Sequence, residues 1–328
     1  AAIRSSSAVS TVPQPVANLL GKPVQRFDDV PRRVRDEAVV VLGQRKLLQR
    51  LGPRLSHAHS FWGFLDAGAA GRLAVMHLLA TLEHREGASF DVDVLIDYRA
   101  RRPRMVFDAD HYSEVDEPAL TLYEVKDVTG APFLLLAGPE PDFRWQQFVD
   151  AVIGLVDTLE VELTVGLAGV PWPAPHTRPI AMSAHGTESG LIEGYVPWVG
   201  TMEVPGSVGA LLELKLGAAG EAAMGFVAHV PHYLSQLDHP RASLALLEAV
   251  SGSTGLLFSL DGLREAADRV DAEVAAQVEG SEDNLEQMRA LERQYDAVVE
   301  ARAGGAAAGV AGIPNAEEIG AQVEQFLA

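Results

Sequence analysis

The chain has 328 residues, enough to bury a large hydrophobic core in one main domain with an appendage. Its apolar runs are too short to span a bilayer, and it has no signal-peptide pattern and no cysteine, so we expect a cytoplasmic protein without disulfides. The net charge of −19 argues against nucleic acid and anionic membranes as partners.

The first 50 residues predict an N-terminal arm followed by the first regular elements. Residues 1–26 are rich in Ser and Pro with little periodicity, which is typical of an extended arm lying on another surface. From Leu55 the pattern becomes α/β, with a strand predicted over 55–61 and a helix over 69–84. The glycine-rich turn between them lets the backbone approach another group closely.

A β-hairpin insertion is predicted next. Before it, residues 90–96 alternate Val and Ile with Asp, which predicts a half-buried strand. The hairpin itself is predicted over about 104–128, where two β-like runs lie on either side of a polar middle. Residues 1–104 carry a net charge of +6 and residues 105–328 one of −25. The boundary falls inside the insertion, where basic residues directly precede acidic ones: Arg99, Arg101, Arg102, Arg104, then Asp108, Asp110, Glu114, Asp116 and Glu117.

Two interpretations of these charges are open. They are either two solvated faces of a hairpin or a charge-complementary contact between subunits, with Arg101, Arg102, Arg104, Asp108 and Asp110 at the interface.

The remaining core alternates strands with helices of ten to sixteen residues. This alternation predicts a three-layer α/β/α domain over residues 51–259, with a mainly parallel sheet and helices on both faces. Strands are predicted over 132–137, 161–167, 180–183 and 225–230, and helices over 143–159 and 242–250.

Residues 260–328 predict a C-terminal helical appendage. Two apolar stripes separated by Gly280-Ser281 predict an amphipathic helical hairpin, followed by a linker over 303–312 and a last helix over 316–327. The hairpin must bury its apolar stripe, either as a lid over the ligand edge of the core or against a neighbouring subunit.

Ligands of open α/β sheets bind beyond the carboxyl ends of the strands, so polar residues that follow predicted strands are the candidate site residues. In the first such loop, beside Gly68, Asp66 either caps the next helix or serves as a catalytic carboxylate or a contact for a neutral or cationic group. In the second, Asp142 is expected to cap a helix, which leaves Glu140 as the freer carboxylate.

The third loop is the most pocket-like, because four prolines within residues 171–179 confine its backbone. His176, Thr177 and Arg178 offer a base, a hydroxyl and a fixed cation. The alternative is a rigid structural loop whose arginine pairs with a carboxylate.

His232 and Tyr233 follow the last predicted core strand and are expected to be pocket or packing residues. His229 and His232 have a spacing that resembles a metal site, but Pro231 prevents a regular helix there and no third ligand is placed, so no metal is expected. The phosphate-binding, zinc-protease and serine-hydrolase motifs are absent, and the glycines of the first turn do not fit a dinucleotide site, so no cofactor is expected.

Taken together, these loops resemble the proteasome assembly chaperone 2-like family, in particular a bacterial, actinobacterial-type branch. The resemblance spans roughly residues 50–300. The segments that carry it are Gly63–Gly68 with Ala70-Gly71, Gly138–Pro141, Pro175–Pro179, Pro231–Tyr233 and, in the helical tail, Leu291–Asp296.

The resemblance implies a core like that of purine nucleoside phosphorylases and self-association, with a trimer favoured by fold analogy. It implies no known reaction. Family members tied to proteasome assembly often end in a hydrophobic residue, tyrosine and any residue, whereas this chain ends Gln325-Phe326-Leu327-Ala328, so its tail is not expected to dock on proteasome subunits.

Two functional hypotheses follow. The first is a homo-oligomeric assembly or binding protein with a ligand pocket at the strand ends. The alternative is a hydrolase or nucleoside-phosphorylase-like enzyme under a helical lid, with His176 as base, Asp66 or Glu140 as acid or orienting carboxylate, and Arg178 as anion clamp.

Overall fold

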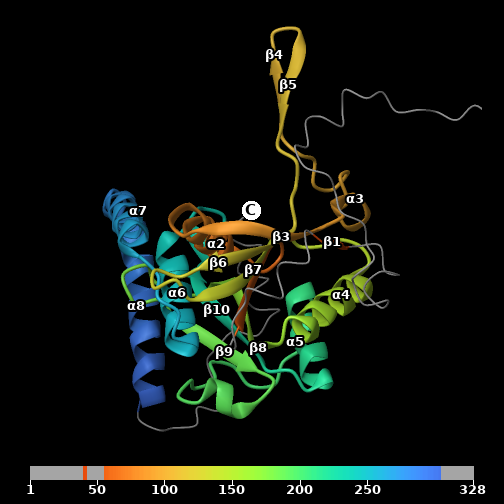
Figure 1. Ribbon diagram of the computed structural model, residues 1–328. Coiled ribbons are helices and arrows are strands. Elements are labelled where there is room, and N and C mark those ends of the chain that lie inside the picture. The colour runs from red at the N-terminus through yellow and green to blue at the C-terminus, as the bar shows by residue number, and fades with distance from the viewer. Residues whose placement is uncertain (1–39, 43–54, 304–328) are drawn as a thin grey trace, which may run out of the picture.

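A computed structural model describes residues 40–42 and 55–303 of the chain (Figure 1). The predicted N-terminal arm and last helix, and almost all of the predicted linker, lie outside the described residues.

The core is a mixed sheet in which eight described strands run in the order β1-β3-β6-β7-β2-β8-β10-β9. The four central strands, β7, β2, β8 and β10, are parallel, and the strands flanking them pair antiparallel. The bounds are β1 Val40–Leu42, β2 Leu55–Trp62, β3 His84–Phe90, β6 Thr121–Lys126, β7 Pro132–Pro139, β8 Val161–Trp172, β9 Met182–Gly186 and β10 Ala223–Pro231.

Helices cover both faces of this sheet, so the described chain forms the three layers that the sequence predicts (Figure 1). One face carries α4 and α5, and the other carries α2 and α6, with α7 and α8 outside α6. The bounds are α2 Ala70–Thr81, α3 Val92–Leu95, α4 Trp145–Thr158, α5 Val208–Ala219, α6 Pro240–Thr254, α7 Asp261–Glu279 and α8 Glu282–Ala303, with short 3-10 turns η2 Ala67–Ala69, η3 Ser189–Ile192 and η4 His232–Leu234.

Apolar spacing explains the layers. In α4, Phe148, Val152 and Leu155 recur on one face and are buried against the sheet. In β7, residues 133–137 are all buried, as expected of a strand covered on both faces.

The predicted strand over 90–96 is wrong. The strand β3 ends at Phe90, and the Asp91 carboxylate accepts a hydrogen bond from the Asp93 N–H at 3.1 Å, which starts the short helix α3. Asp91, the first of the aspartates that alternate with valines here, caps a helical turn instead of lying within a strand.

The hairpin insertion is shorter than predicted. It consists of β4 Met105–Asp108 and β5 His111–Val115 and projects from the body of the molecule (Figure 1). The run predicted as its second arm is β6, which lies between β3 and β7 in the main sheet and buries Leu122 and Val125.

The C-terminal helical hairpin is confirmed as α7 and α8. Leu263 and Ala267 of α7 are buried, whereas Met288 is the one buried side chain among the described residues of α8. Within the described part of the chain, no helix combines the length and apolarity needed to cross a membrane.

Candidate functional site

Four loops meet at one edge of the sheet, as the sequence predicts. The parallel strands end level in two neighbouring pairs, since Trp62 pairs with Pro139 and Trp172 pairs with Pro231, and all four end on the same side of the sheet. The loops that carry the predicted site residues therefore begin side by side.

Asp66 caps α2. Its Oδ1 accepts hydrogen bonds from the N–H groups of Gly71 at 2.7 Å and Arg72 at 3.4 Å. Burial raises the pKa of Asp66, and these two N–H groups oppose that rise. The neighbouring Gly68 has a φ of 66° and lies so close to Val230 and His239 that an added Cβ would be 3.0 Å from each.

Glu140 is not a free carboxylate, because its Oε1 accepts the Val208 N–H at 2.8 Å at the start of α5. Asp142 does not cap α4 as predicted. Its Oδ2 accepts the Asp97 N–H at 2.6 Å and pairs with Arg101, also at 2.6 Å.

His176 and Tyr233 form a bonded pair. The Tyr233 hydroxyl oxygen accepts the His176 backbone N–H at 2.7 Å and lies 2.9 Å from His176 Nδ1. Burial lowers the pKa of His176 and raises that of Tyr233. The adjacent His232 ring meets Tyr233 edge-on, with ring centroids 5.3 Å apart.

Thr177 and Arg178 bind α8. The Thr177 hydroxyl donates to Glu292 at 2.6 Å, and Arg178 donates to Asp296 through two N–H groups at 2.8 Å each and to Glu292 at 3.2 Å. Arg178 therefore pairs with carboxylates that lie more than 110 residues further along the chain.

The structure thus brings His176, Thr177, Arg178 and Tyr233 together beneath the C-terminal helices. Gly68 lies next to the segment that follows Tyr233, since its N–H donates to the Ser235 carbonyl and its carbonyl accepts the His239 N–H. Glu140 lies apart from this group, on the side of the sheet that α5 covers.

Sequence reasoning missed two residues of this region. His239 directly precedes α6 and is 1% exposed, and Asp271 of α7 pairs with Arg241 at 2.7 Å. His239 could have been noticed in the sequence, because it directly precedes the proline that starts a helix. Asp271 could not, because it is one of several acidic residues in its helix.

Other buried imidazoles lie within the sheet. His57 and His59 stack at 5.8 Å on β2, and His229 Nε2 lies 2.8 Å from the Ser183 hydroxyl, with its ring stacked 4.1 Å from that of Trp172. Among the described residues, no group of three or more acidic or histidine side chains could hold a metal ion.

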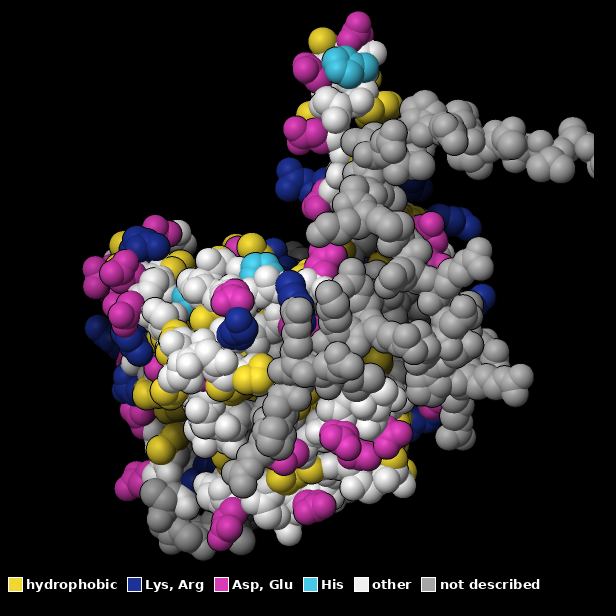
Figure 2. Space-filling model, viewed as in Figure 1, with side chains coloured by type: hydrophobic (Ala, Val, Ile, Leu, Met, Phe, Trp, Pro, Cys, Tyr) yellow, Lys and Arg dark blue, Asp and Glu magenta, His cyan; other side chains and the backbone are white. Residues whose placement is uncertain are grey.

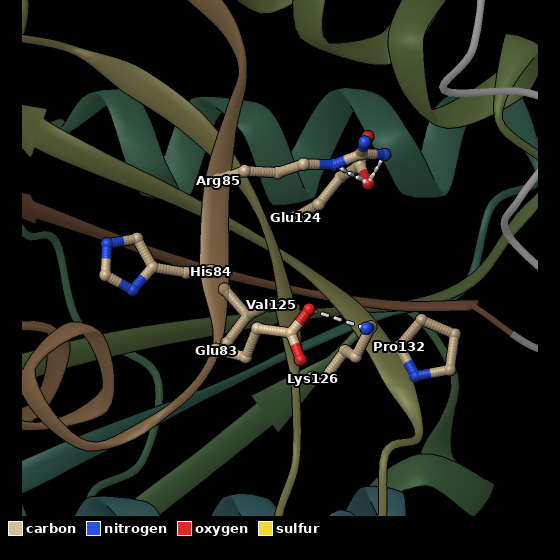
Figure 3. A pocket seen from close by; sticks show the side chains of 7 residues that line it. All are labelled: Glu83, His84, Arg85, Glu124, Val125, Lys126 and Pro132. Carbon is tan, nitrogen blue, oxygen red and sulfur yellow. Dashed lines mark hydrogen bonds and ion pairs between the residues drawn. The ribbon is translucent and has the colours of Figure 1, made fainter.

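One surface cavity, of about 210 Å³, lies away from these loops (Figure 3). It opens at the opposite edge of the sheet, where β3 and β7 begin, and two ion pairs line it, Lys126 with Glu83 and Arg85 with Glu124. None of the predicted site residues contributes to it.

The three-layer fold, with its loops gathered at the strand ends, makes this an α/β/α protein. The PAC2 family profile matches residues 60–278, so the chain belongs to the PAC2 family. No functionally curated protein is similar enough to count as a match.

Solved structures agree. A Mycobacterium tuberculosis protein of unknown function is 43% identical, with a TM-score of 0.78, over 81% of this chain and 92% of that one. A Corynebacterium glutamicum protein of unknown function is 37% identical, with a TM-score of 0.76, over 80% and 98%. A Mycobacterium tuberculosis proteasome-assembly chaperone homologue is 26% identical, with a TM-score of 0.66, over 71% and 99%.

Proposed function

We propose that this protein is a homo-oligomeric assembly or binding protein of the chaperone type rather than an enzyme. Membership of the PAC2 family and the similarity to a proteasome-assembly chaperone homologue support this role. The groups that an enzyme would use also support it, because Asp66, Glu140 and Arg178 are engaged with three different helices and do not converge with His176 on one reacting atom.

The projecting hairpin carries the proposal. Phe107 and Tyr112 pack edge-on at 5.1 Å near its tip and remain 59% and 68% exposed, and Met105 and Val115 are exposed beside them. Figure 2 shows hydrophobic and acidic side chains intermixed along the hairpin. An aromatic pair held on an arm away from its own core is typical of a protein–protein contact.

The charges on the projecting hairpin are separated by sign between its base and its tip. Arg102 and Arg104 are exposed at its base, and Asp108 and Asp110 are exposed at its tip. Arg101 instead bonds the Glu140 carbonyl and Asp142 of its own chain, which anchors the base of the arm. The tip of one subunit would then meet the base of the next, an arrangement compatible with a closed ring such as a trimer.

Sedimentation velocity at low micromolar concentration, at low and moderate salt, tests this function. We expect an oligomer for the wild-type chain, and a double variant Phe107→Ser, Tyr112→Ser that dissociates. Loss of aromatic anchors typically costs about 2 kcal/mol or more, a roughly 30-fold weaker association.

The matched control is Leu214→Ser on α5, which is 72% exposed but lies on the body of the molecule and should leave the oligomer intact. A monomeric wild-type protein under both salt conditions would contradict the proposed self-association. An unchanged oligomer in the double variant would show that the aromatic pair of the hairpin does not form the contact between subunits.

A further inference from the structure

Two exposed phenylalanines flank the base of the projecting hairpin. Phe64 lies in the loop after β2 and Phe143 in the loop before α4, and they are 62% and 50% exposed. Each adjoins a residue that lies against the Arg101 guanidinium. A Cβ on Gly63 would be 3.9 Å from Arg101 Nη1, and Asp142 pairs with Arg101 at 2.6 Å. Since neighbouring Cα atoms are about 3.8 Å apart, both phenylalanines lie close to Arg101.

The backbone that presents these two rings is held in place. The carbonyls of Trp62 and Leu65, on either side of Phe64, accept hydrogen bonds from neighbouring segments at 3.1 and 3.0 Å. The Phe143 N–H donates to the Leu95 carbonyl at 3.0 Å. An exposed apolar side chain on a fixed backbone loses little conformational freedom when a partner covers it, so this surface is preorganised for docking.

Exposed arginines lie beside the two rings. Arg144 directly follows Phe143 and is exposed, and Arg102 is exposed at the base of the hairpin. Arg104 is exposed as well, but the acidic second arm of the hairpin returns beside it, since the Asp116 N–H donates to the Arg104 carbonyl at 2.8 Å. Arg102 and Arg144 are therefore the cations that an acidic partner would meet next to the phenylalanines.

The hairpin tip of this same chain has the complementary character, because an exposed aromatic pair stands there beside exposed Asp108 and Asp110. A chain's own tip does not reach its own phenylalanines. A strand rises about 3.3 Å per residue, so β4 carries the tip roughly 10 Å or more from the base, and the hairpin projects away from the body (Figure 1). The occupant that fits is the tip of a second copy.

We propose that Phe64, Phe143, Arg102 and Arg144 form an acceptor surface for the hairpin tip of a second copy of this chain. The aromatic pair of the tip covers the two phenylalanines, and the acidic residues of the tip face the two arginines. Because tip and acceptor surface are different parts of the chain, the contact is head to tail and each subunit offers one of each. This inference rests on the proposed self-association and adds where the hairpin docks.

Sedimentation velocity from low to high micromolar concentration compares an acceptor variant, Phe64→Ser with Phe143→Ser, and the tip variant, Phe107→Ser with Tyr112→Ser. We expect each variant alone to associate at least about 30-fold more weakly than wild type. An equimolar mixture of the two should form a one-to-one dimer, because the intact tip of the acceptor variant fits the intact acceptor surface of the tip variant.

The matched control is the double variant Val128→Ser, Leu257→Ser. These residues are 55% and 51% exposed, and the Val128 N–H donates to the Leu257 carbonyl at 3.1 Å, so they are also neighbours. They lie where β7 begins, at the end of the sheet opposite the acceptor surface. This variant should assemble like wild type.

The outcomes separate the docking site from the proposed function. An acceptor variant that assembles like wild type while the tip variant dissociates would overturn the acceptor surface alone. A mixture of the two variants that stays monomeric would also overturn it. A monomeric wild type, or an unaffected tip variant, would overturn the proposed hairpin contact together with its acceptor.

Charge reversal provides a second test if the serine variants do not fold. Arg102→Asp with Arg144→Asp, and Asp108→Arg with Asp110→Arg, should each weaken association at least about tenfold, because like charges then meet. Aspartate suits position 144, whose φ is 56° at the start of α4. All four changes in one chain should restore association, and failure to restore it would count against the acceptor surface.

Discussion

At the scale of single residues, several side chains hold segments that are distant in sequence. Asp127, at the end of β6, is 6% exposed. Its Oδ1 accepts the N–H groups of Thr129 and Ala131 and the Thr129 hydroxyl, and its Oδ2 accepts the Leu257 N–H at 3.0 Å. One carboxylate therefore closes the β6–β7 turn and ties it to the segment between α6 and α7.

Replacing Asp127 by Ala should lower the free energy of unfolding by about 2–4 kcal/mol, because it leaves buried N–H donors without an acceptor. Burial opposes the charge of this carboxylate, but its four hydrogen bonds lower the pKa of Asp127 overall. Urea unfolding at pH 7 measures the loss.

The control for this variant is Asp157→Ala, at the exposed end of α4, which should change the free energy by less than about 0.5 kcal/mol. An equal loss in both variants would mean that the hydrogen bonds of Asp127 add nothing specific to stability.

At the scale of elements, α8 is attached mainly through polar contacts. Arg178 reaches Glu292 and Asp296, and the Tyr295 hydroxyl donates to the Pro179 carbonyl at 2.9 Å. At the far end, Arg302 lies 3.9 Å from the centre of the Trp198 ring and donates to backbone carbonyls beside it. A helix held in this way should exchange its amide protons sooner than the apolar core.

We expect Arg178→Ala to speed amide hydrogen exchange in α8 several-fold while leaving exchange in β2, β7 and β8 unchanged, because only the ion pairs with α8 are lost. Hydrogen exchange read out by mass spectrometry measures both regions at once. Arg264→Ala, which removes exposed ion pairs to Glu248 and Asp261 on the surface of α6 and α7, is the control and should leave exchange in α8 unchanged. Uniformly faster exchange after Arg178→Ala would indicate global destabilisation and contradict a local tether.

Elements with a clear apolar period could be predicted from the sequence, and those without one could not. The stripes of α4, α7 and α8 were visible as periodicity, and β7 as an apolar run. The helix α5 was not predicted, because leucine, alanine and glycine occur on most of its own faces and leave no clear apolar period. The signals at its ends were present: Ser207 caps it by accepting the Ala210 N–H, and Gly220 ends it. Its start is also bound by Glu140, a contact with a loop 68 residues away.

The candidate site was predictable only in its placement. Parallel strands bring their following loops to one edge, so Asp66, His176 and Tyr233 could be assigned to that edge in advance. The partners of the adjacent Thr177 and Arg178 could not, because nothing in local spacing says which of the many acidic residues of α8 lie against this loop.

At the scale of the whole molecule, neutral imidazoles are buried on both faces of the sheet. His57 and His59 face α4 and α5, whereas His239 lies on the side of α6. Burial lowers the pKa of His57 to about 3 and that of His59 to about 4, with a further contribution from neighbouring imidazoles. Burial likewise lowers the pKa of His229 to about 3.

This arrangement makes the fold sensitive to acid. The folded pKa of each histidine lies below the unfolded value of about 6.5, so between pH 6.5 and about 4 the unfolded chain binds protons that the folded chain does not. Stability is therefore complete above pH 6.5 and falls as the pH is lowered, by about 1.4 kcal/mol per pH unit for each such histidine.

Urea unfolding between pH 7 and pH 4.5 should show this loss, and His57→Leu should reduce its slope by about 1.4 kcal/mol per pH unit, since one proton-binding group is removed from the unfolded chain alone. The control is His111→Gln, an exposed position on the projecting hairpin, which should keep the wild-type slope. A slope that is the same in His57→Leu and wild type would mean that water or a rearranged neighbour accommodates the charged imidazole inside the sheet, and that the acid sensitivity of the fold arises from other groups.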